Sequence, residues 1–240
     1  MSQNIFITGT GRESGLGYNF TLRYLENGDH VFATVRKPSE ALCKLQEKYP
    51  QQLEIITMDI GSTESVRAAV DYVSGKVNYI DTLINNAVLV RDDYGEMKPF
   101  EELDLDDIAV IMNVSSVGPL RVIKAMLPLL KKAEDPMIVN ISSDAGSCTL
   151  AATTCQLDYH MSKSALNMAT KILHNKFEQE KGVKILAVHP GWVKTYESYE
   201  KAPFTPYEQC ERLRLVFEDR RKRYDEGAIF VNYANEIVPW

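Results

Sequence analysis

Cysteine is scarce in this sequence. The 240 residues contain four, Cys43, Cys148, Cys155 and Cys210. Their number and spacing match neither a metal-binding cluster nor the dense disulfide framework of a small secreted domain. We therefore expect no metal site, and we expect the chain to work in a reducing compartment, the cytoplasm.

The chain also lacks a long apolar run and an excess of basic charge. No stretch approaches about eighteen consecutive apolar residues, and the N-terminus shows no basic segment followed by a long apolar one. Acidic residues outnumber basic ones by 33 to 27, which gives a net charge of −6. The sequence thus predicts neither a membrane nor a nucleic-acid partner. The basic run 220–223 lies between acidic pairs and is interpreted as a solvated helix face.

Internal repeats, linkers and low-complexity tracts are absent as well. With 45% hydrophobic and 25% charged residues, the composition is that of an ordinary globular protein. A length of 240 residues suits one large α/β domain, so we treat 1–240 as a single domain.

Short apolar runs alternate with helical patterns along the chain. The alternation predicts βαβ units, and hence a single Rossmann-like domain: a doubly wound parallel sheet of about seven strands with helices on both faces. Strands are expected at 5–7, 30–35, 53–58, 80–84, 137–141, 183–188 and 228–231, and helices at 16–25, 39–48, 63–74, 105–130, 158–180 and 205–224.

A glycine-rich segment follows the first expected strand directly. Gly9, Gly11, Gly15 and Gly17 lie between the apolar run 5–7 and the first helical pattern. Glycines let the backbone approach a pyrophosphate closely, and a helix N-terminus offers free N–H groups and positive potential. The segment therefore predicts the phosphate site of a dinucleotide.

Basic residues follow the second expected strand. In dinucleotide folds an acidic residue here accepts the ribose 2′-OH, whereas a basic one accommodates a 2′-phosphate. Arg36 and Lys37 occupy this place, and Arg12 in the glycine loop adds a third cation. These residues favour NADP(H), and NAD(H) stays open as the alternative.

Tyr159 and Lys163 are four residues apart and so lie on the same face of a helix. A nearby fixed positive charge favours the phenolate and moves a tyrosine pKa of about 10 toward neutrality. Such a phenol can give a proton to a carbonyl oxygen or take one from an alcohol. The pair is predicted to be a proton-transfer centre, and His160 beside it is expected to point elsewhere.

Short polar residues stand where expected strands end. Asn85 and Asn86 follow the fourth strand, and Ser142 and Ser143 the fifth, at the sheet edge where ligands of such folds bind. Asn113 lies within the apolar-periodic stretch 105–130. Because an asparagine amide competes for backbone groups, Asn113 predicts a kink or an adjacent water there.

These features in this order resemble the short-chain dehydrogenases/reductases over essentially the whole chain. The motifs are the glycine loop, Asn85-Asn86-Ala87, Asn113, Ser143, Tyr159-x-x-x-Lys163 and Pro190-Gly191. Within that family, 142–147, 189–195 and 236–240 look like C-factor-type carbonyl reductases. The resemblance implies an NADP(H)-dependent oxidoreductase that interconverts a small ketone or aldehyde with an alcohol. It also implies a homodimer or homotetramer, because the helices at 105–130 and 158–180 commonly pair in this family.

The resemblance implies a role for each matching residue. Tyr159 would be the acid/base, Lys163 would lower its pKa and hold the nicotinamide ribose, and Ser143 would bind the substrate oxygen. Asn113 would anchor a water in the proton relay. The cofactor-binding set would be Gly9, Arg12, Ser14, Gly15, Leu16, Gly17, Arg36, Asp59, Ile60, Asn86, Ala87, Tyr159, Lys163, Pro190, Gly191, Val193 and Thr195.

The sequence departs from the family pattern in two places. Counted from Thr8-Gly9, the next two glycines come two residues late, and we expect Gly9 to be the strand-end glycine because the run 5–7 precedes it. Val88 stands where the family usually has glycine. Since a β-branched residue does not readily take a positive φ, the turn there must be rebuilt.

Two alternative functions stay open. A glycine loop of this length resembles that of enoyl-acyl carrier protein reductases, whose catalytic tyrosine lies seven residues before the lysine. Gln156 holds that position here and cannot ionise as a phenol does, which disfavours C=C reduction. The second alternative is a non-catalytic nucleotide sensor, supported by Val88 and the altered loop. Asn113, Ser143, Tyr159 and Lys163 together argue against it, because a sensor needs no proton relay.

Aromatic residues gather in two segments expected to overhang the nicotinamide. They form either an apolar substrate pocket or a lid that packs on itself. They are Tyr94, Trp192, Tyr196, Tyr199 and Phe204.

Overall fold

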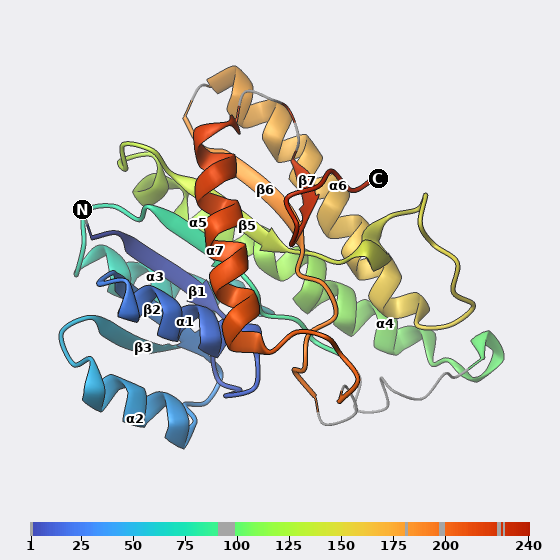
Figure 1. Cartoon of the computed structure of the whole chain (residues 1–240), viewed down its shortest axis with the longest axis horizontal. Coiled ribbons are helices and arrows are strands. Elements are labelled where there is room, and N and C mark those ends of the chain that lie inside the picture. Colours follow the sequence, from blue (N-terminus) through green and yellow to red (C-terminus); the bar gives the residue numbers. More distant parts are fainter. Residues whose placement is uncertain (1, 91–98, 181, 197–199, 225–226, 228) are drawn as a thin grey trace.

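A parallel sheet forms the centre of the molecule (Figure 1). The structure is a computed structural model that describes residues 2–90, 99–180, 182–196, 200–224, 227 and 229–240. Within these ranges seven strands pair in parallel in the order β3-β2-β1-β4-β5-β6-β7. They are β1 (Asn4–Thr8), β2 (His30–Val35), β3 (Leu53–Thr57), β4 (Thr82–Asn85), β5 (Met137–Ile141), β6 (Lys184–His189) and β7 (Phe230–Asn232). The predicted doubly wound sheet is confirmed.

Helices cover both faces of this sheet. They are α1 (Leu16–Glu26), α2 (Glu40–Lys48), α3 (Thr63–Ser74), α4 (Leu105–Met112), α5 (Gly118–Leu130), α6 (Leu157–Glu180) and α7 (Pro206–Lys222), with short 3₁₀ turns at Phe100–Glu102 and Asp144–Gly146. Ser39, Ser62 and Thr205 each cap a helix N-terminus with the side-chain oxygen. Such caps satisfy backbone N–H groups that the helix leaves unpaired, and they explain where these helices begin.

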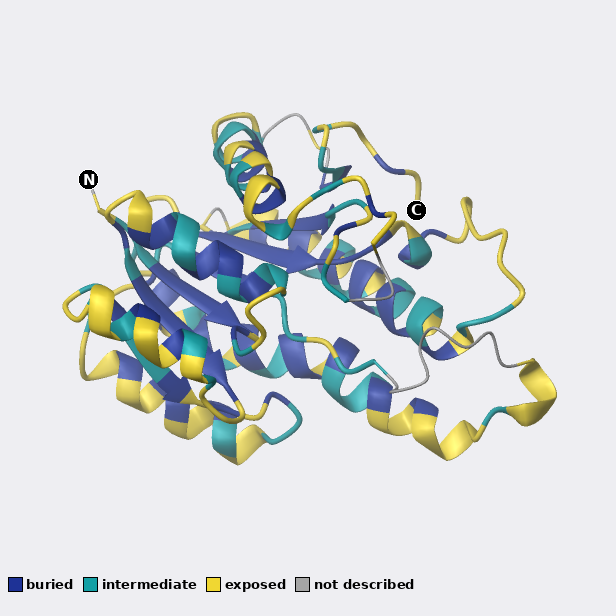
Figure 2. Cartoon of the chain, turned by 60° about the horizontal axis from the view of Figure 1, so that its bottom comes forward, coloured by how far each residue is buried: buried dark blue, intermediate teal, exposed yellow. Residues whose placement is uncertain are grey.

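Alternation along the strands divides the core into two layers. Ile5 and Ile7 of β1 pack with residues of α1, α2 and α7, whereas Phe6 between them packs with residues of α3 and α5. Successive side chains of a strand point to opposite faces, so a strand covered on both faces must be apolar throughout. Figure 2 shows the result, buried strands between helices whose outer faces are exposed.

The apolar stretch 105–130 is one helical rod with a defect. A π-helical turn, Asn113–Val117, separates α4 from α5, so the helix is irregular at Asn113, where the sequence predicted a kink or an adjacent water. Extra-residue turns of this kind are frequent at functional sites. Pro119 lies in the first turn of α5, where its missing N–H costs nothing.

In the described part of the chain, Leu105–Leu130 is also the one helix long and apolar enough to cross a membrane on length and composition, with a mean hydropathy of 1.3 over its most apolar window. Five of its side chains, Val122, Ile123, Met126, Leu129 and Leu130, are buried in the core layer that also holds β-strand and α3 residues. Packing against the sheet accounts for this hydropathy, because core helices pass the same test.

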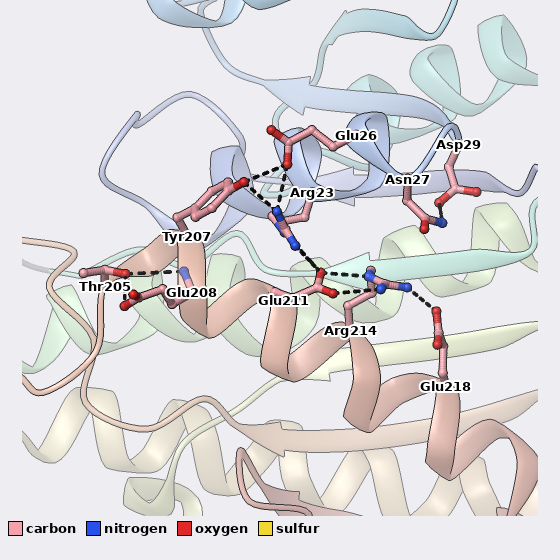
Figure 3. A network of polar contacts seen from close by, with 10 residues as sticks. All are labelled: Arg23, Glu26, Asn27, Asp29, Thr205, Tyr207, Glu208, Glu211, Arg214 and Glu218. Atoms are coloured by element: carbon pink, nitrogen blue, oxygen red, sulfur yellow. Dashed lines mark hydrogen bonds and ion pairs between the residues drawn. The ribbon is translucent and has the colours of Figure 1, made fainter.

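Charged side chains join α7 to α1 (Figure 3). Arg23 of α1 contacts the Glu211 carboxylate at 2.9 Å and the Tyr207 hydroxyl at 2.6 Å, and Arg214 contacts Glu211 at 2.9 Å. These contacts hold α7 against α1, which begins directly after the glycine loop.

The basic run at the end of α7 is not a uniformly solvated face, and the sequence-based interpretation is wrong for half of it. Arg220 is buried and donates to the side chain and backbone oxygens of Asn235, and Arg221 donates to Thr82 Oγ1. Lys222 and Arg223 are exposed. Arg220 and Arg221 therefore tie α7 to the chain around β4 and β7.

Candidate active site

A cleft of about 1460 Å³ opens at the carboxyl ends of the strands. Its lining includes Gly9, Arg12, Gly15, Leu16, Arg36, Asp59, Ile60, Asn86, Ala87, Asn113, Ser143, Tyr159, Lys163, Pro190, Gly191, Val193 and Thr195. Parallel strands end at one edge, so residues that follow six different strands meet there. The predicted site residues thus converge on one cavity, with the exception of Ser14 and Gly17.

Ser14 and Gly17 support the lining instead. The Ser14 hydroxyl donates to the Thr195 carbonyl at 3.1 Å, which links the glycine loop to the segment after β6. A Cβ at Gly17 would lie 2.3 Å from the Gly9 carbonyl oxygen, so only glycine fits at the start of α1. The loop needs both residues for its shape.

Gly9 is the strand-end glycine, as the sequence predicted. β1 ends at Thr8, and Gly9 has a φ of +74°, a left-handed conformation that favours glycine. The N–H groups of Gly9 and Thr10 both donate to the Thr34 carbonyl, at 3.0 and 3.1 Å. The two extra loop residues therefore lie after the turn and leave β1 regular.

The N-terminus of α1 is suited to bind an anion. Among the described residues no side chain caps this helix, whose N-cap is Gly15. The first N–H groups of the helix and its positive end are thereby left for a ligand in the cleft. Asn86 holds the turn from the other side, because its amide donates to the carbonyls of Thr8 and Gly9 at 2.9 and 3.1 Å.

Three cations line the cleft near the end of β2: Arg12, Arg36 and Lys37. Arg12 also lies over the ring of Tyr196, with 4.1 Å from the guanidinium carbon to the ring centroid. The longer glycine loop thus contacts the segment after β6 through Arg12 as well as through Ser14.

Lys163 is the buried cation of the site. Its side chain is 4% exposed, and its Nζ donates to the Ile141 carbonyl at 2.8 Å and lies 5.6 Å from the centroid of the Tyr159 ring. Burial lowers the pKa of Lys163 to about 8. At neutral pH the group is still mainly an ammonium, and an ammonium this close to a phenol stabilises the phenolate.

Ser143 stands at the end of β5, 8% exposed. Its hydroxyl donates to Asp144 Oδ1 at 2.9 Å and accepts from the Ala145 N–H at 3.1 Å. The Asp144 N–H in turn donates to His189 Nδ1 at 3.0 Å. Burial lowers the pKa of His189, and the nearby Asp144 carboxylate opposes that effect. Both observations favour a neutral imidazole, whose Nδ1 accepts from the Asp144 backbone and holds the turn after β5.

The side-chain polar atoms of Asn113 bond to Gly61 and Arg121. Its Nδ2 donates to the Gly61 carbonyl at 3.2 Å. Arg121 donates to its Oδ1 at 2.5 Å and to its backbone carbonyl at 2.9 Å. Asn113 thus joins the β3–α3 turn to the π-helical turn, and its predicted role in holding a relay water stays a prediction.

The turn at Val88 is rebuilt without a positive φ. Among the described non-glycine residues only Gln156 and Asn235 have positive φ. Ser115, in the π-helical turn, fixes the next residue: its Oγ accepts from the Leu89 N–H at 3.0 Å and donates to the Leu89 carbonyl at 3.2 Å. Gln156 lines the cleft with a φ of 58° at the entry to α6.

The sequence missed part of the lining. His160 lies in the cleft rather than elsewhere on the helix, with its Nδ1 2.9 Å from the Gln156 carbonyl and its ring edge-on to Tyr159. Asp144 and the segment 150–153 also line the cleft. The loop between β5 and α6 gave no periodic signal, although its position before Tyr159 pointed to the site.

The aromatic residues do not act as one group. Trp192 and Tyr196 line the cleft. Phe204 packs on Tyr233, with 4.7 Å between ring centroids, behind Gly191. Tyr94 and Tyr199 lie outside the described residues.

Comparisons with known proteins agree with this architecture. Residues 3–203 match the family model for the short chain dehydrogenases. An uncharacterised oxidoreductase of Schizosaccharomyces pombe is 36% identical, over 98% of this chain and 97% of that protein. C-signal of Myxococcus xanthus is 30% identical, over 67% of this chain and 93% of its own length.

Solved structures give the same picture. An NADPH-bound carbonyl reductase from chicken fatty liver superposes with a TM-score of 0.87 at 30% identity, covering 100% of this chain and 99% of that one. The carbonyl reductase Sniffer of Drosophila melanogaster gives a TM-score of 0.89 at 26% identity, with all of both chains covered. Together with the cleft, these matches show that the chain belongs to the short-chain dehydrogenase/reductase family of oxidoreductases.

Proposed function

We propose that the protein is an NADP(H)-dependent carbonyl reductase or alcohol dehydrogenase, working on a small ketone, aldehyde or secondary alcohol. The observation that carries the proposal is the convergence of Tyr159, Lys163 and Ser143 in one cleft with the glycine turn. The carbonyl reductases among the similar structures, one of them NADPH-bound, support it.

The residues of the cleft fit the cofactor. The left-handed Gly9 and the start of α1 suit a pyrophosphate, and Arg12, Arg36 and Lys37 suit a 2′-phosphate. Pro190, Gly191, Val193 and Thr195 line the opposite part of the cleft, where the nicotinamide carboxamide would lie. The bound cofactor would supply or accept the hydride.

The chain's own residues would move the proton. In reduction, the Tyr159 hydroxyl gives its proton to the carbonyl oxygen, and in oxidation the phenolate takes it from the alcohol. Lys163, whose Nζ lies 5.6 Å from the centroid of the Tyr159 ring and donates to the Ile141 carbonyl, would stabilise the phenolate. Ser143 lines the same cleft and would bind the reacting oxygen.

Replacing Tyr159 by Phe tests the proposal. Oxidation of NADPH with a panel of ketones and aldehydes should fall by roughly 10² to 10⁴-fold, because the proton donor is lost. NADPH binding, followed by nucleotide fluorescence, should change little. Tyr72→Phe, on the exposed face of α3, is the matched control and should keep wild-type turnover.

The same assay separates the alternatives. NADPH binding without consumption by any carbonyl compound would favour a nucleotide sensor. Consumption with enoyl thioesters alone would favour C=C reduction. Normal turnover in Tyr159→Phe would overturn the assignment of the acid/base.

A further inference from the structure

Gln209 lies in the first turn of α7 and bonds to the turn that follows β6. Its side chain is 1% exposed, and its Nε2 donates to the Pro190 carbonyl at 2.5 Å. Because a carbonyl oxygen only accepts, the amide must present its NH₂ group to Pro190. Pro190 and Gly191 line the part of the cleft where the nicotinamide carboxamide would lie.

The buried amide of Gln209 has a cost that packing alone does not explain. Within the part of the chain that the structure describes, no group bonds the buried Oε1 of this amide. An unpaired buried oxygen disfavours folding, and an apolar side chain of similar length would fill the same place without it. The bond to Pro190 is what the amide provides and such a side chain would not.

The same face of α7 supports the turn after β6 a second time. Arg212, three residues after Gln209, lies over the rings of Phe204 and Tyr233, with 5.0 and 5.9 Å from its guanidinium carbon to the ring centroids. Gly191 has a φ of +80°, and a Cβ there would lie 2.7 Å from the Tyr233 ring. The rings therefore pack against the turn, and Gln209 fixes its carbonyl group.

We infer that Gln209 is a positioning residue for the nicotinamide end of the cofactor and acts through the Pro190 carbonyl. The inference rests on the proposed function, which places the nicotinamide beside Pro190, and it identifies a residue that holds this part of the cleft in shape. Gln209 does not itself line the cleft. A turn already fixed in its binding geometry does not have to be ordered when the cofactor binds, so the bond contributes to affinity.

Gln209→Met tests the inference through binding alone. Methionine has a similar length and removes the hydrogen-bond donor. The two ligands are NADPH and 2′-phospho-ADP-ribose, which keeps all the phosphates and lacks the nicotinamide. In calorimetric titrations the dissociation constant of NADPH should rise about three- to tenfold, the value of roughly one hydrogen bond. The dissociation constant of 2′-phospho-ADP-ribose should stay at its wild-type value.

The emission of bound NADPH gives a spectroscopic readout of the same variant. Reduced nicotinamide fluoresces more strongly when a binding site holds the ring rigidly. The emission of NADPH bound to Gln209→Met should therefore fall toward that of the free nucleotide. A side chain that only stabilised the fold would leave this emission unchanged at temperatures well below unfolding.

Gln46→Met is the matched control. The Gln46 amide also donates to a backbone carbonyl, that of Leu53, at 3.2 Å, and it lies on α2 away from the residues that line the cleft. This variant should bind both ligands as the wild type does. Gln209→Ala replaces Gln209→Met if methionine prevents folding, because alanine favours a helix and removes the same donor.

Two results would overturn the inference: unchanged NADPH affinity in a folded Gln209 variant, or equal losses of affinity for both ligands, which would show a general loosening of the cleft. These binding measurements do not depend on turnover. A failure of all carbonyl compounds to react would count against the proposed function alone, so the two failures can be told apart.

Discussion

At the scale of single residues, Lys163 shows how the site combines function with a cost in stability. Its ammonium group is taken out of water, and its pKa is lowered to about 8 from 10.5. In the unfolded chain the ammonium group stays in water and keeps its proton up to about pH 10.4, so it pays no desolvation cost. Burying the charged group therefore lowers the free energy of unfolding, and this penalty has its full size below about pH 8. The penalty disappears as the pH rises from 8 toward 10.5, because the lysine then loses its proton in the unfolded chain as well.

Lys163→Met should abolish turnover and yet raise the free energy of unfolding at pH 7 by up to about 3 kcal/mol. Methionine fills a similar volume and carries no charge. The gain over wild type should shrink as pH rises toward 10, which denaturant titrations at several pH values would measure. Lys124→Met, on the exposed face of α5, should stay within about 0.5 kcal/mol of wild type. A gain independent of pH would contradict the account.

Also at the scale of single residues, we propose that Arg36 determines the choice of nucleotide by binding the 2′-phosphate. Arg36→Asp should weaken NADPH binding by roughly tenfold or more, because a charged hydrogen-bond partner of the phosphate is lost and a repulsive charge replaces it. NADH binding should change much less. Lys222→Asp, an equal charge change at the far end of α7, serves as control. Equal losses for both nucleotides would sink the specificity argument.

At the scale of elements, Arg121 joins two loops of the cleft. Besides its two bonds to Asn113, its guanidinium donates to the Ile60 carbonyl at 3.3 Å and to Thr63 Oγ1 at 3.2 Å. Ile60 lies in the turn after β3, where the adenine is expected, and Asn113 opens the π-helical turn between α4 and α5. Arg121 therefore holds the adenine side of the cleft against the defect in the long helix.

Arg121→Met should raise the dissociation constant of NADPH several-fold and change kcat less, because it loosens the adenine side and leaves Tyr159 and Lys163 in place.

Asn113→Ala discriminates between two roles for Asn113. If Asn113 acts with Arg121 in joining the loops, its variant should follow Arg121→Met. If it holds a relay water, kcat should fall with nucleotide affinity intact. Binding titrations and initial rates, with Lys124→Met as control, measure the difference.

The elements were predictable from the sequence to different degrees. Each strand could be located because a strand covered on both faces, such as 137–141, is a continuous apolar run in the sequence. The glycine loop and the spacing of Tyr159 and Lys163 located the site. The contact of Ser143 with Asp144 and that of Arg121 with Asn113 were not predicted, because they depend on side-chain directions in irregular turns. The burial of Arg220 was missed for a related reason: its partner, Asn235, comes from a loop near β7.

At the scale of the whole molecule, α6 has two different faces. One is buried and carries Ser162, Lys163 and Leu166 beside the cleft. The other exposes Met161, Met168 and Ile172, the last two by 63% and 60%, and α4 exposes Val110 by 55%. We propose that a second copy of the chain covers these helices, as the family resemblance implies. The site and the proposed subunit contact would then share one helix.

The double substitution Met168→Glu, Ile172→Glu tests that arrangement. Two carboxylates placed in an apolar contact would have to lose water without a partner, which costs several kcal/mol, enough to dissociate a dimer of micromolar affinity. Sedimentation or light scattering should show the wild type as a dimer or larger and the variant as a monomer. Leu215→Glu, at an exposed leucine of α7, should leave at least the dimer intact. A monomeric wild type, or a variant of unchanged mass, would refute pairing through α6.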